Sequence, residues 1–550
     1  MKKNILSFLI FTAFAVSANS QTFTNLKPGV SGYFGDAIEH SELIYYRAGT
    51  DAAGIEYWTT NGTPNGTKMV KDINPGTDSG SGSNFIRFNN KVIFSANNGT
   101  NGRELWETDG TNAGTIMIKD INPGAPNSNP GPFLYYSKSV MIQDQVLIFS
   151  ANNVNTGTEL YKYTQLFSPL TSSFYWDAVL VKDINTGTGH SSPLDFTVYK
   201  GKVYFSATDG TAGSGKGREL WVTDGTEAGT MMLKDINPGT GNSSPSNFTV
   251  SNDFLFFTAN DGTNGIELWV TDGTTPGTKM VKDINDSADS SPRYLYSFNN
   301  KLYFSALELT NKRDLWVSDG TSAGTKKVEG SYISNLFPSF EPNNFTELNG
   351  ELFFSGFDRA IWKLNSQGKA EFAATVNEQP LGVDVSGKLS DFTVYNGRIY
   401  LKGYTVDDGY SLWESDGTAG GTKKIEPPIA TNTNPLGGTS FAMKAFSNGL
   451  FLNANFDTNG WSTWKVVTNP TFVDRISHKA LSIFPNPVAD KLNINTDLTV
   501  KEIRLVSMSG QTIGTWKNTQ SVSLSGISQG AYIVHIDTDQ GEAVRKMMKN

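Results

Sequence analysis

The sequence predicts an all-β protein built from about nine similar units, and a β-propeller is the fold that best accommodates them. A tripeptide ending in an aromatic residue recurs along the chain at spacings of 46 to 60 residues. Each full unit also contains four short segments rich in aromatic and β-branched residues, separated by Gly, Asn and Asp. Four hairpin-linked strands at this period are typical of a propeller blade, so we expect eight or nine four-stranded blades. A β-solenoid is the alternative, although its coils are usually shorter.

The strands are clearest in the unit around Trp269, where we expect them at residues 247–251, 254–259, 266–271 and 279–284. An aromatic residue that returns in every unit fits packing between sheets better than ligand binding, because a ligand rarely needs nine equal contacts. We therefore expect the repeated aromatic residues to be buried. They are Trp58, Trp106, Tyr161, Trp221, Trp269, Trp316, Trp362, Trp413 and Trp464.

The repeated motif has a recognisable consensus. In one unit it reads Glu219-Leu220-Trp221-x-x-Asp224-Gly225-Thr226-x-x-Gly229-Thr230, and near-identical copies start at Glu104, Glu267 and Asp314. This pattern resembles the ELWxxDGT repeat family of bacterial secreted proteins, over about residues 21–472. The resemblance implies secretion but does not indicate an activity, because the family is defined by its repeat.

The N-terminal segment has the features of a secretory signal peptide, which we assign to residues 1–20. Lys2 and Lys3 precede a short apolar run, and small residues lead to a cleavage site between Ser20 and Gln21. The apolar run is shorter than a bilayer requires, so we expect no transmembrane span in the mature protein.

The C-terminal segment, residues 481–550, follows a linker at residues 473–480 and predicts a second, small β-sandwich. It resembles the type A C-terminal sorting domain of the type IX secretion system. That resemblance implies the type IX secretion machinery as a partner, and a secreted, extracellular or outer-surface location in a Gram-negative bacterium. The matching residues are Pro485, Asn486, Pro487, Gly510, Gly530, Tyr532 and Lys546.

The composition argues against several classes of protein. A net charge of −8 without a Lys/Arg cluster excludes an ordinary nucleic-acid binder, which needs a basic footprint. The chain has no cysteine, so disulfides and thiolate metal sites are excluded. Only His40 and His190 fall in the repeats, which makes a Ser-His-Asp site or a His-rich metal site a poor interpretation.

Oxygen-rich loops follow the Lys-Asp-Ile-Asn segments and give weak calcium candidates, namely Asp72, Asn74 and Asp78. Their alternating spacing suits Ca²⁺, which prefers oxygen ligands. In the alternative interpretation these side chains close turns by bonding to nearby backbone N–H groups. Calcium is the one cofactor that the sequence indicates.

One unit departs from the repeat. Tyr161 and Lys182 are 21 residues apart, whereas Trp221 and Lys234 are 13 apart. Exposed aromatic residues commonly stack on sugars or anchor protein partners. An alternative is a packed cap over an irregular blade. The candidates in the extra segment are Phe167, Phe174, Tyr175 and Trp176.

We therefore expect a non-enzymatic binding or adhesion protein whose partner is an extracellular glycan or a surface protein. A polysaccharide-active hydrolase or lyase and a structural surface component are the alternatives. The enzyme would need a pocket with convergent carboxylates, whereas most repeat aspartates, such as Asp224 and Asp272, stand directly before Gly in turns.

Overall fold

The computed structural model describes residues 21–549 apart from 81–83, 132–139, 143–145, 211–214, 287, 309–311, 331–339, 357–359, 377–388, 406–408, 428–433, 438–440, 469–480, 486, 508–511 and 539–540. Every regular element within these residues is a β-strand. The predicted signal peptide and linker lie outside them. The chain forms a large compact unit, residues 23–465, and a C-terminal unit that begins at residue 466. Within the described ranges, no helix is long and apolar enough to cross a membrane.

The unit around Trp269 confirms the predicted strands and shows how the repeat folds. It consists of β18 (Ser246–Ser251), β19 (Phe254–Asn260), β20 (Ile266–Thr271) and β21 (Lys279–Lys282), paired antiparallel in that order. The fourth strand ends two residues earlier than expected, because the N–H of Ile284 donates to the carboxylate of Glu267 at 3.1 Å.

The same four-strand meander forms eight sheets from consecutive strands, which we call blades 1 to 8. Blade 5 is the unit just described. Blade 1 has β2 (Ser31–His40), β3 (Leu43–Thr50), β4 (Gly54–Thr60) and β5 (Lys68–Lys71), and blade 2 has β6 (Ile86–Phe88), β7 (Lys91–Asn97), β8 (Arg103–Thr108) and β9 (Ile116–Lys119). Blade 3 has β10 (Val140–Ile142), β11 (Val146–Asn153), β12 (Gly157–Ser168) and β13 (Ser173–Lys182). Blade 4 has β14 (Leu194–Tyr199), β15 (Lys202–Thr208), β16 (Arg218–Thr223) and β17 (Met231–Lys234).

Blades 6 to 8 continue the series. They are β22 (Arg293–Phe298), β23 (Lys301–Leu307), β24 (Arg313–Ser318) and β25 (Lys326–Lys327); β26 (Asn343–Leu348), β27 (Glu351–Gly356), β28 (Ala360–Leu364) and β29 (Ala370–Thr375); and β30 (Ser390–Tyr395), β31 (Arg398–Thr405), β32 (Gly409–Ser415) and β33 (Lys423–Lys424).

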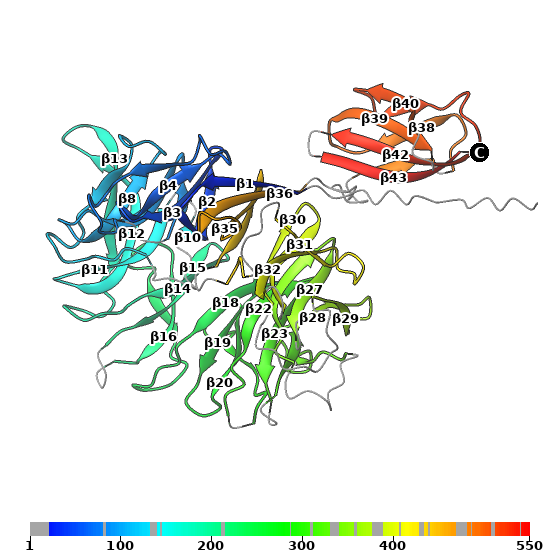
Figure 1. The fold of residues 1–550 in the computed structure, drawn as a ribbon. Helices are drawn as coiled ribbons and strands as arrows, with labels where there is room; N and C mark the ends of the chain where they lie inside the picture. Colours follow the sequence, from blue (N-terminus) through cyan, green and yellow to red (C-terminus); the bar gives the residue numbers. More distant parts are fainter. Residues whose placement is uncertain are drawn as a thin grey trace, which may run out of the picture. The chain divides into compact units, whose positions relative to one another are not determined.

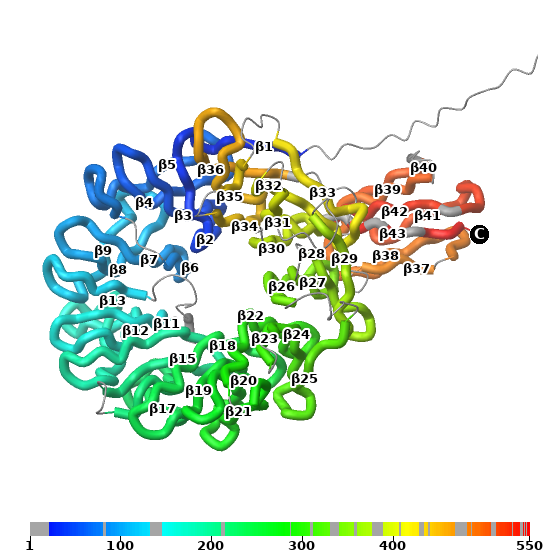
Figure 2. Tube along the Cα trace, turned by 60° about the horizontal axis from the view of Figure 1, so that its bottom comes forward, coloured from blue at the N-terminus to red at the C-terminus, as the bar shows by residue number. Residues whose placement is uncertain are grey.

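The ninth blade joins the two ends of the repeat. It contains β34 (Met443–Phe446), β35 (Gly449–Ala454) and β36 (Ser462–Thr468), and its outer strand is the N-terminal β1 (Gln21–Lys27). Figure 1 shows β1 and β36 side by side, and Figure 2 shows the blades arranged in a ring with the first strand of each nearest the centre. The described strands of this unit therefore form a nine-bladed propeller.

Packing between blades explains the repeated tryptophan. Trp269 in blade 5 is 6 % exposed and packs with Leu220 and Ile236 of blade 4. Equivalent positions are buried in all the other blades except blade 7, where Trp362 is half-buried. The ammonium group of Lys234 in blade 4 lies 6.0 Å from the centre of the Trp269 ring, so the same residue also makes a cation–π contact across the boundary.

The C-terminal unit is a small β-sandwich. One sheet has the order β37 (Ser482–Phe484), β38 (Lys491–Asn495) and β41 (Ser521–Ser523). The other has the order β40 (Thr512–Lys517), β39 (Val500–Ser507), β42 (Gly530–Thr538) and β43 (Gly541–Lys549). Leu492 from the first sheet and Ile503, Val534 and Met547 from the second belong to one fully buried core.

Candidate functional site

The Asp-Gly-Thr-x-x-Gly-Thr part of the repeat builds a closed turn between the third and fourth strands. In blade 4, Asp224 Oδ1 accepts hydrogen bonds from the N–H of Thr226 at 2.9 Å and from its hydroxyl at 2.7 Å. The hydroxyl of Thr226 accepts from the N–H of Gly229, and Thr223 and Thr230 join their hydroxyls at 2.7 Å beneath the turn. These bonds lower the pKa of Asp224. The polar side chains of the motif are thus used in hydrogen bonds within the turn itself, as predicted from its residues.

The motif glutamate has a role that sequence reasoning missed: it fastens the loop between blades. Glu104 is fully buried, and its carboxylate accepts hydrogen bonds from the N–H of Ile121 at 2.8 Å and from the N–H of Ser128 at 3.0 Å. The hydroxyl of Ser128 donates to it as well, at 2.5 Å. Burial raises the pKa of Glu104 to about 7, although these hydrogen bonds favour the charged form and oppose the rise.

The lysine of Lys-Asp-Ile-Asn also acts across blade boundaries. Lys71 donates to the carbonyl of Thr115 at 2.8 Å, and Lys182 donates to that of Thr230 at 2.8 Å, each reaching the closed turn of the next blade. The glutamate, tryptophan, aspartate and lysine of the repeat therefore all pack or form hydrogen bonds within the propeller. A ligand site is better sought where a blade departs from the repeat.

The calcium candidates lie in the loop after β5, and the structure does not test them as metal ligands. Asp72 and Asn74 are half-buried, and Asp78 is exposed. Nowhere in the described part of the chain do three or more His, Asp or Glu side chains lie together as a metal site would require. The corresponding loop of blade 2 is closed internally, since Asn122 Nδ2 donates to the carbonyl of Asn127 at 3.3 Å. Calcium at Asp72, Asn74 and Asp78 stays a prediction.

The aromatic candidates of blade 3 lie on a hairpin in which β12 and β13 are longer than their counterparts. Phe167, Phe174 and Tyr175 are exposed, and the first two rings lie 5.2 Å apart. Trp176 differs, because it packs edge-on against Phe88 of blade 2 at 4.9 Å. The segment is therefore a regular extension of the blade with exposed side chains, rather than a cap folded over it.

The first strands of blades 4, 5 and 6 line a groove on the inner side of the ring, with a volume of about 860 Å³. Figure 1 labels β14, and Figure 2 shows β18 and β22 near the centre of the ring. Hydroxyl and amide groups from Thr197, Asn247, Thr249 and Ser297 line it, together with apolar and aromatic side chains from all three strands. None of the residues lining this groove, all of which are described, carries a carboxylate.

Tyr294 is the feature of this groove that departs most from the repeat. In five blades the second residue of the first strand has a left-handed backbone conformation, and a bulge shifts the pairing register there. In four of these blades the residue is Asn or Asp, namely Asp195, Asn247, Asn344 and Asp391. In blade 6 it is Tyr294, with φ of 56° and half of its surface exposed. A bulky residue in this conformation is strained, which Asn and Asp largely avoid.

Arg293 precedes Tyr294 and is an exposed cation in the groove lining. On β14 itself, burial raises the pKa of Asp195 to about 6, while the charge of Arg218 opposes the rise.

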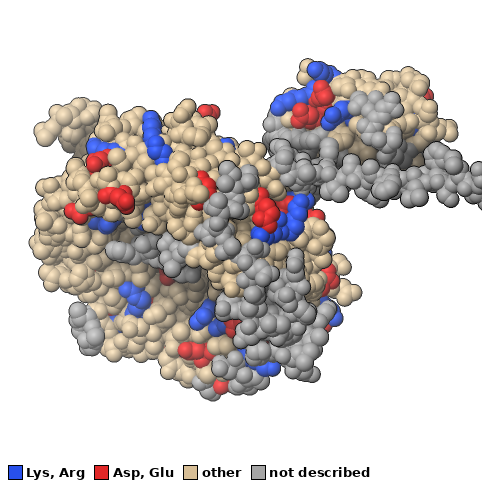
Figure 3. Space-filling view, in the orientation of Figure 1, with Lys and Arg blue, Asp and Glu red and all other residues tan. Residues whose placement is uncertain are grey.

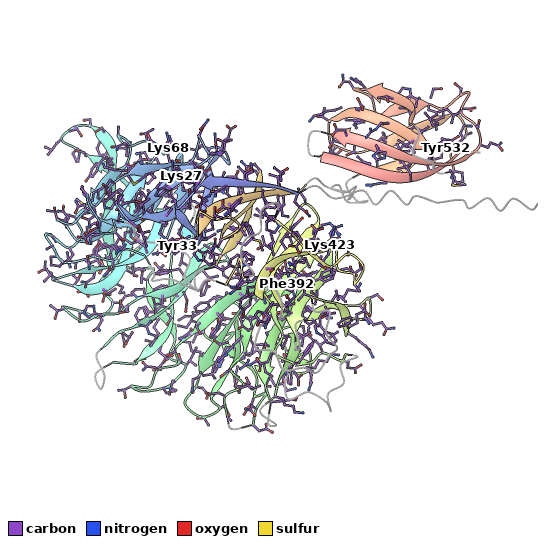
Figure 4. The ribbon with its side chains drawn as sticks, viewed as in Figure 1. Lys27, Tyr33, Lys68, Phe392, Lys423 and Tyr532 are labelled. Atoms are coloured by element: carbon purple, nitrogen blue, oxygen red, sulfur yellow. The ribbon has the colours of Figure 1, made fainter. Side chains whose placement is uncertain are left out.

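Figure 3 shows charged residues of both signs scattered singly and in small mixed groups over the face that is drawn. Figure 4 labels Phe392 on β30, the half-buried residue next to Asp391, where the repeat pattern is retained.

The pattern that marks this site was readable in the sequence. The first strands of blades 4, 5, 7 and 8 share an Asp/Asn-Phe-Thr segment, as in Asp195-Phe196-Thr197, whereas blade 6 has Tyr294-Leu295-Tyr296. Aligning the first strands of the units would have singled out these two tyrosines.

The class of protein defined by these features is a nine-bladed propeller with a C-terminal β-sandwich. The family of secretion system C-terminal sorting domains matches residues 482–550, so this segment is a sorting domain and the chain is exported through the type IX secretion system. Tyr532 of the sorting motif is buried, and its hydroxyl donates to the carbonyl of Ser528 at 2.8 Å (Figure 4). Pro485 and Pro487 are exposed, Gly530 begins β42 and Lys546 pairs with Ile533 in β43. Asn486, Gly510 and Ser20 lie outside the described residues, and Gln21 begins β1.

Several solved structures are similar to this chain, at low identity. The extracellular domain of BT4673 from B. thetaiotaomicron is 10 % identical, with a TM-score of 0.31, over 94 % of this chain and 74 % of that one. Sqt1 from Saccharomyces cerevisiae is 12 % identical, with a TM-score of 0.33, over 82 % and 99 %. The β-propeller domain of the Trilobed protease from Pyrococcus furiosus is 10 % identical, with a TM-score of 0.30, over 72 % and 95 %. No curated protein matches.

Proposed function

We propose that this protein is a secreted, non-enzymatic binding protein whose propeller holds an extracellular glycan in the groove of β14, β18 and β22. The observation that carries the proposal is Tyr294, an exposed aromatic ring kept in a strained backbone conformation in the one of these five blades where the residue is neither Asn nor Asp. Strain of this kind persists where the surrounding structure imposes it, and it clusters at ligand sites.

The chemistry of the groove suits a sugar. An exposed tyrosine ring offers a stacking surface for the apolar face of a pyranose, and its hydroxyl offers a hydrogen bond. The hydroxyls of Thr197, Thr249 and Ser297 and the amide of Asn247 supply further donors and acceptors for sugar hydroxyls. Arg293 adds a fixed positive charge, which favours a glycan that carries carboxylate or sulfate groups.

The same groove argues against a glycoside hydrolase at this position. Hydrolysis of a glycosidic bond uses two carboxyl groups on opposite sides of the scissile bond, whereas the lining of this groove contains none. Asp195 belongs to β14 but is not part of the lining. We therefore propose binding without turnover.

A glycan array probed with the purified, exported chain tests the proposal. We expect stronger binding to glycans that carry carboxylate or sulfate groups than to neutral glycans, and a loss of at least tenfold in affinity in Tyr294→Ala. Phe372→Ala is the matched control, because Phe372 is a similarly exposed aromatic residue on the outermost strand of blade 7. Glycan binding that is unchanged in Tyr294→Ala, or release of reducing sugar from a bound glycan, would contradict it.

A further inference from the structure

The hairpin formed by β12 and β13 ends in an apolar tip. No charged residue occurs between Lys162 and Asp177. Leu170 at the apex is 98 % exposed, and Phe174 and Phe167 beside it are 66 % and 53 % exposed. Figure 1 shows this hairpin, in cyan beside the β13 label, projecting beyond the sheets around it.

The two faces of the hairpin are both apolar. Phe167 and Phe174 are cross-strand partners whose rings contact one another on one face. Leu166 and Tyr175 are the next pair and, because side chains alternate along a strand, they lie on the opposite face. With Leu170 at the apex, the end of the hairpin therefore has apolar side chains on both faces, beside the paired Ser168 and Ser173.

This arrangement decides between the possible occupants. A partner surface that packs on one face of the hairpin would leave the other face in water. A lipid layer surrounds a projecting element, so it covers both faces and the apex at once.

Two hydrogen bonds pair polar groups of the tip with one another, which lowers the cost of placing them in an apolar medium. The N–H of Thr171 donates to the hydroxyl of Ser168 at 3.4 Å, and the hydroxyls of Thr171 and Ser173 are 2.8 Å apart. Below the tip, Trp176 contacts Tyr163 and Phe88, so the hairpin is anchored in the blade by an aromatic cluster. Tryptophan and tyrosine rings are favoured at the level of lipid headgroups.

We infer that the β12–β13 hairpin inserts its tip, Phe167 to Phe174, into the interfacial layer of a zwitterionic phospholipid bilayer. The insertion is independent of the groove of β14, β18 and β22 and of any glycan bound there. Because the tip carries no charge, its membrane binding depends on apolar burial and not on electrostatic attraction.

The test is co-sedimentation of the purified, exported chain with phosphatidylcholine vesicles. We expect vesicle binding that is unchanged between 0.1 and 0.5 M NaCl and that falls at least tenfold when Phe167, Leu170 and Phe174 are all changed to Ser. Val154→Ser is the matched control, since Val154 is an equally exposed apolar residue in the loop that precedes β12. Unchanged melting temperatures confirm that both variants fold.

A second measurement reports on the tip directly. The chain has no cysteine, so Leu170→Cys can be labelled at a single position with an environment-sensitive dye. We expect its emission to shift to shorter wavelength on vesicles. No vesicle binding by the unmodified chain, equal binding by the triple variant, or a dye that stays water-exposed on vesicles would each overturn the inference. So would loss of binding to a protein or glycan in the triple variant without any binding to vesicles.

Discussion

The hydroxyl of Ser243 donates a 2.6 Å hydrogen bond to the carboxylate of Glu219, which lies 24 residues earlier in the chain. The N–H groups of Ser243 and Ile236 bond to the same carboxylate at 3.0 and 2.6 Å. One buried side chain thus holds the whole loop that leads from blade 4 into blade 5. Equivalent bonds are made by Glu56, Glu104, Glu159 and Glu267.

Replacing Glu219 with Ala should destabilise the propeller by about 3 kcal/mol, because buried donors lose their acceptor and each costs about 1–3 kcal/mol. Chemical denaturation of the purified chain measures the change. Glu227→Ala is the control, since Glu227 is exposed in the turn of the same blade. A free energy of unfolding that is equal in the two variants would show that the loop is held by other contacts.

The same glutamates predict how stability depends on pH. Burial raises the pKa of Glu56, Glu104, Glu219 and Glu267 from 4.5 to about 7. The folded state therefore holds these protons more tightly than the unfolded state, so their contribution to stability falls as pH rises from about 4.5 to 7. The turn aspartates act in the opposite sense below pH 4, because hydrogen bonds lower the pKa of Asp224 and Asp272.

We accordingly expect the highest melting temperature near pH 5 and a decline of several degrees towards pH 8. Differential scanning fluorimetry across this range measures it, and Glu219→Gln should reduce the slope because it removes one titrating group. A melting temperature that rises from pH 5 to pH 8 would mean that the glutamates are already ionised in the folded state at pH 5.

Trp269→Ala should destabilise the propeller by about 3–5 kcal/mol, the usual cost of truncating a large buried aromatic residue. Trp269 is 6 % exposed between blades 4 and 5 and also receives Lys234 over its ring. Thermal unfolding compares the melting temperature of Trp269→Ala with that of Tyr175→Ala, a control variant that loses an exposed ring. Equal melting temperatures in the two variants would place the repeat tryptophan outside the core.

Calcium at Asp72, Asn74 and Asp78 predicts a higher melting temperature in millimolar Ca²⁺ than in chelator. A ligand that binds only the folded state stabilises it by about 2.7 kcal/mol at a hundredfold excess over its Kd. Asp72→Asn should abolish the shift. Identical melting curves with and without Ca²⁺ would leave the turn interpretation, which the internal bonds of the corresponding loops favour.

Deleting residues 481–550 should leave the protein inside the producing cell, because residues 482–550 form its sorting domain. Immunoblots of culture medium, cell surface and periplasm measure the distribution. A truncated chain found outside the cell in the usual amount would require a different export signal. The propeller itself is expected to fold in this truncation, since its nine sheets use no strand of the deleted segment.

Much of the fold could be predicted from the sequence because each blade is local. The strands around Trp269 are separated by short turns rich in Gly, Asn and Asp, and their pattern of apolar residues sets both strands and register. The sequence does not predict that β1 completes the last blade, because β1 lacks the repeated motif and its partner strand lies more than four hundred residues away.

The candidate site was harder to predict, for physical reasons. The position of Tyr294 in a groove depends on how the first strands of three blades come together, which no single unit encodes. The exposure of Phe167 and Phe174 also could not be read from the residues, because an aromatic hairpin can fold onto its blade or extend from it. Here the pairing of β12 with β13 continues to Ser168 and Ser173, so the hairpin extends.

Closure of the ring by β1 has a consequence for the order in which the protein folds. Blades 1 to 8 each contain their own four strands, so they can form in sequence as the chain becomes available, whereas blade 9 needs both ends of the repeat. Until β36 joins β1, the propeller is an open arc with an unpaired strand edge at each end, and such edges invite pairing with other chains. Joining ends so distant in sequence is slow compared with forming local hairpins. The closing step therefore sets how long the newly made chain remains prone to aggregation.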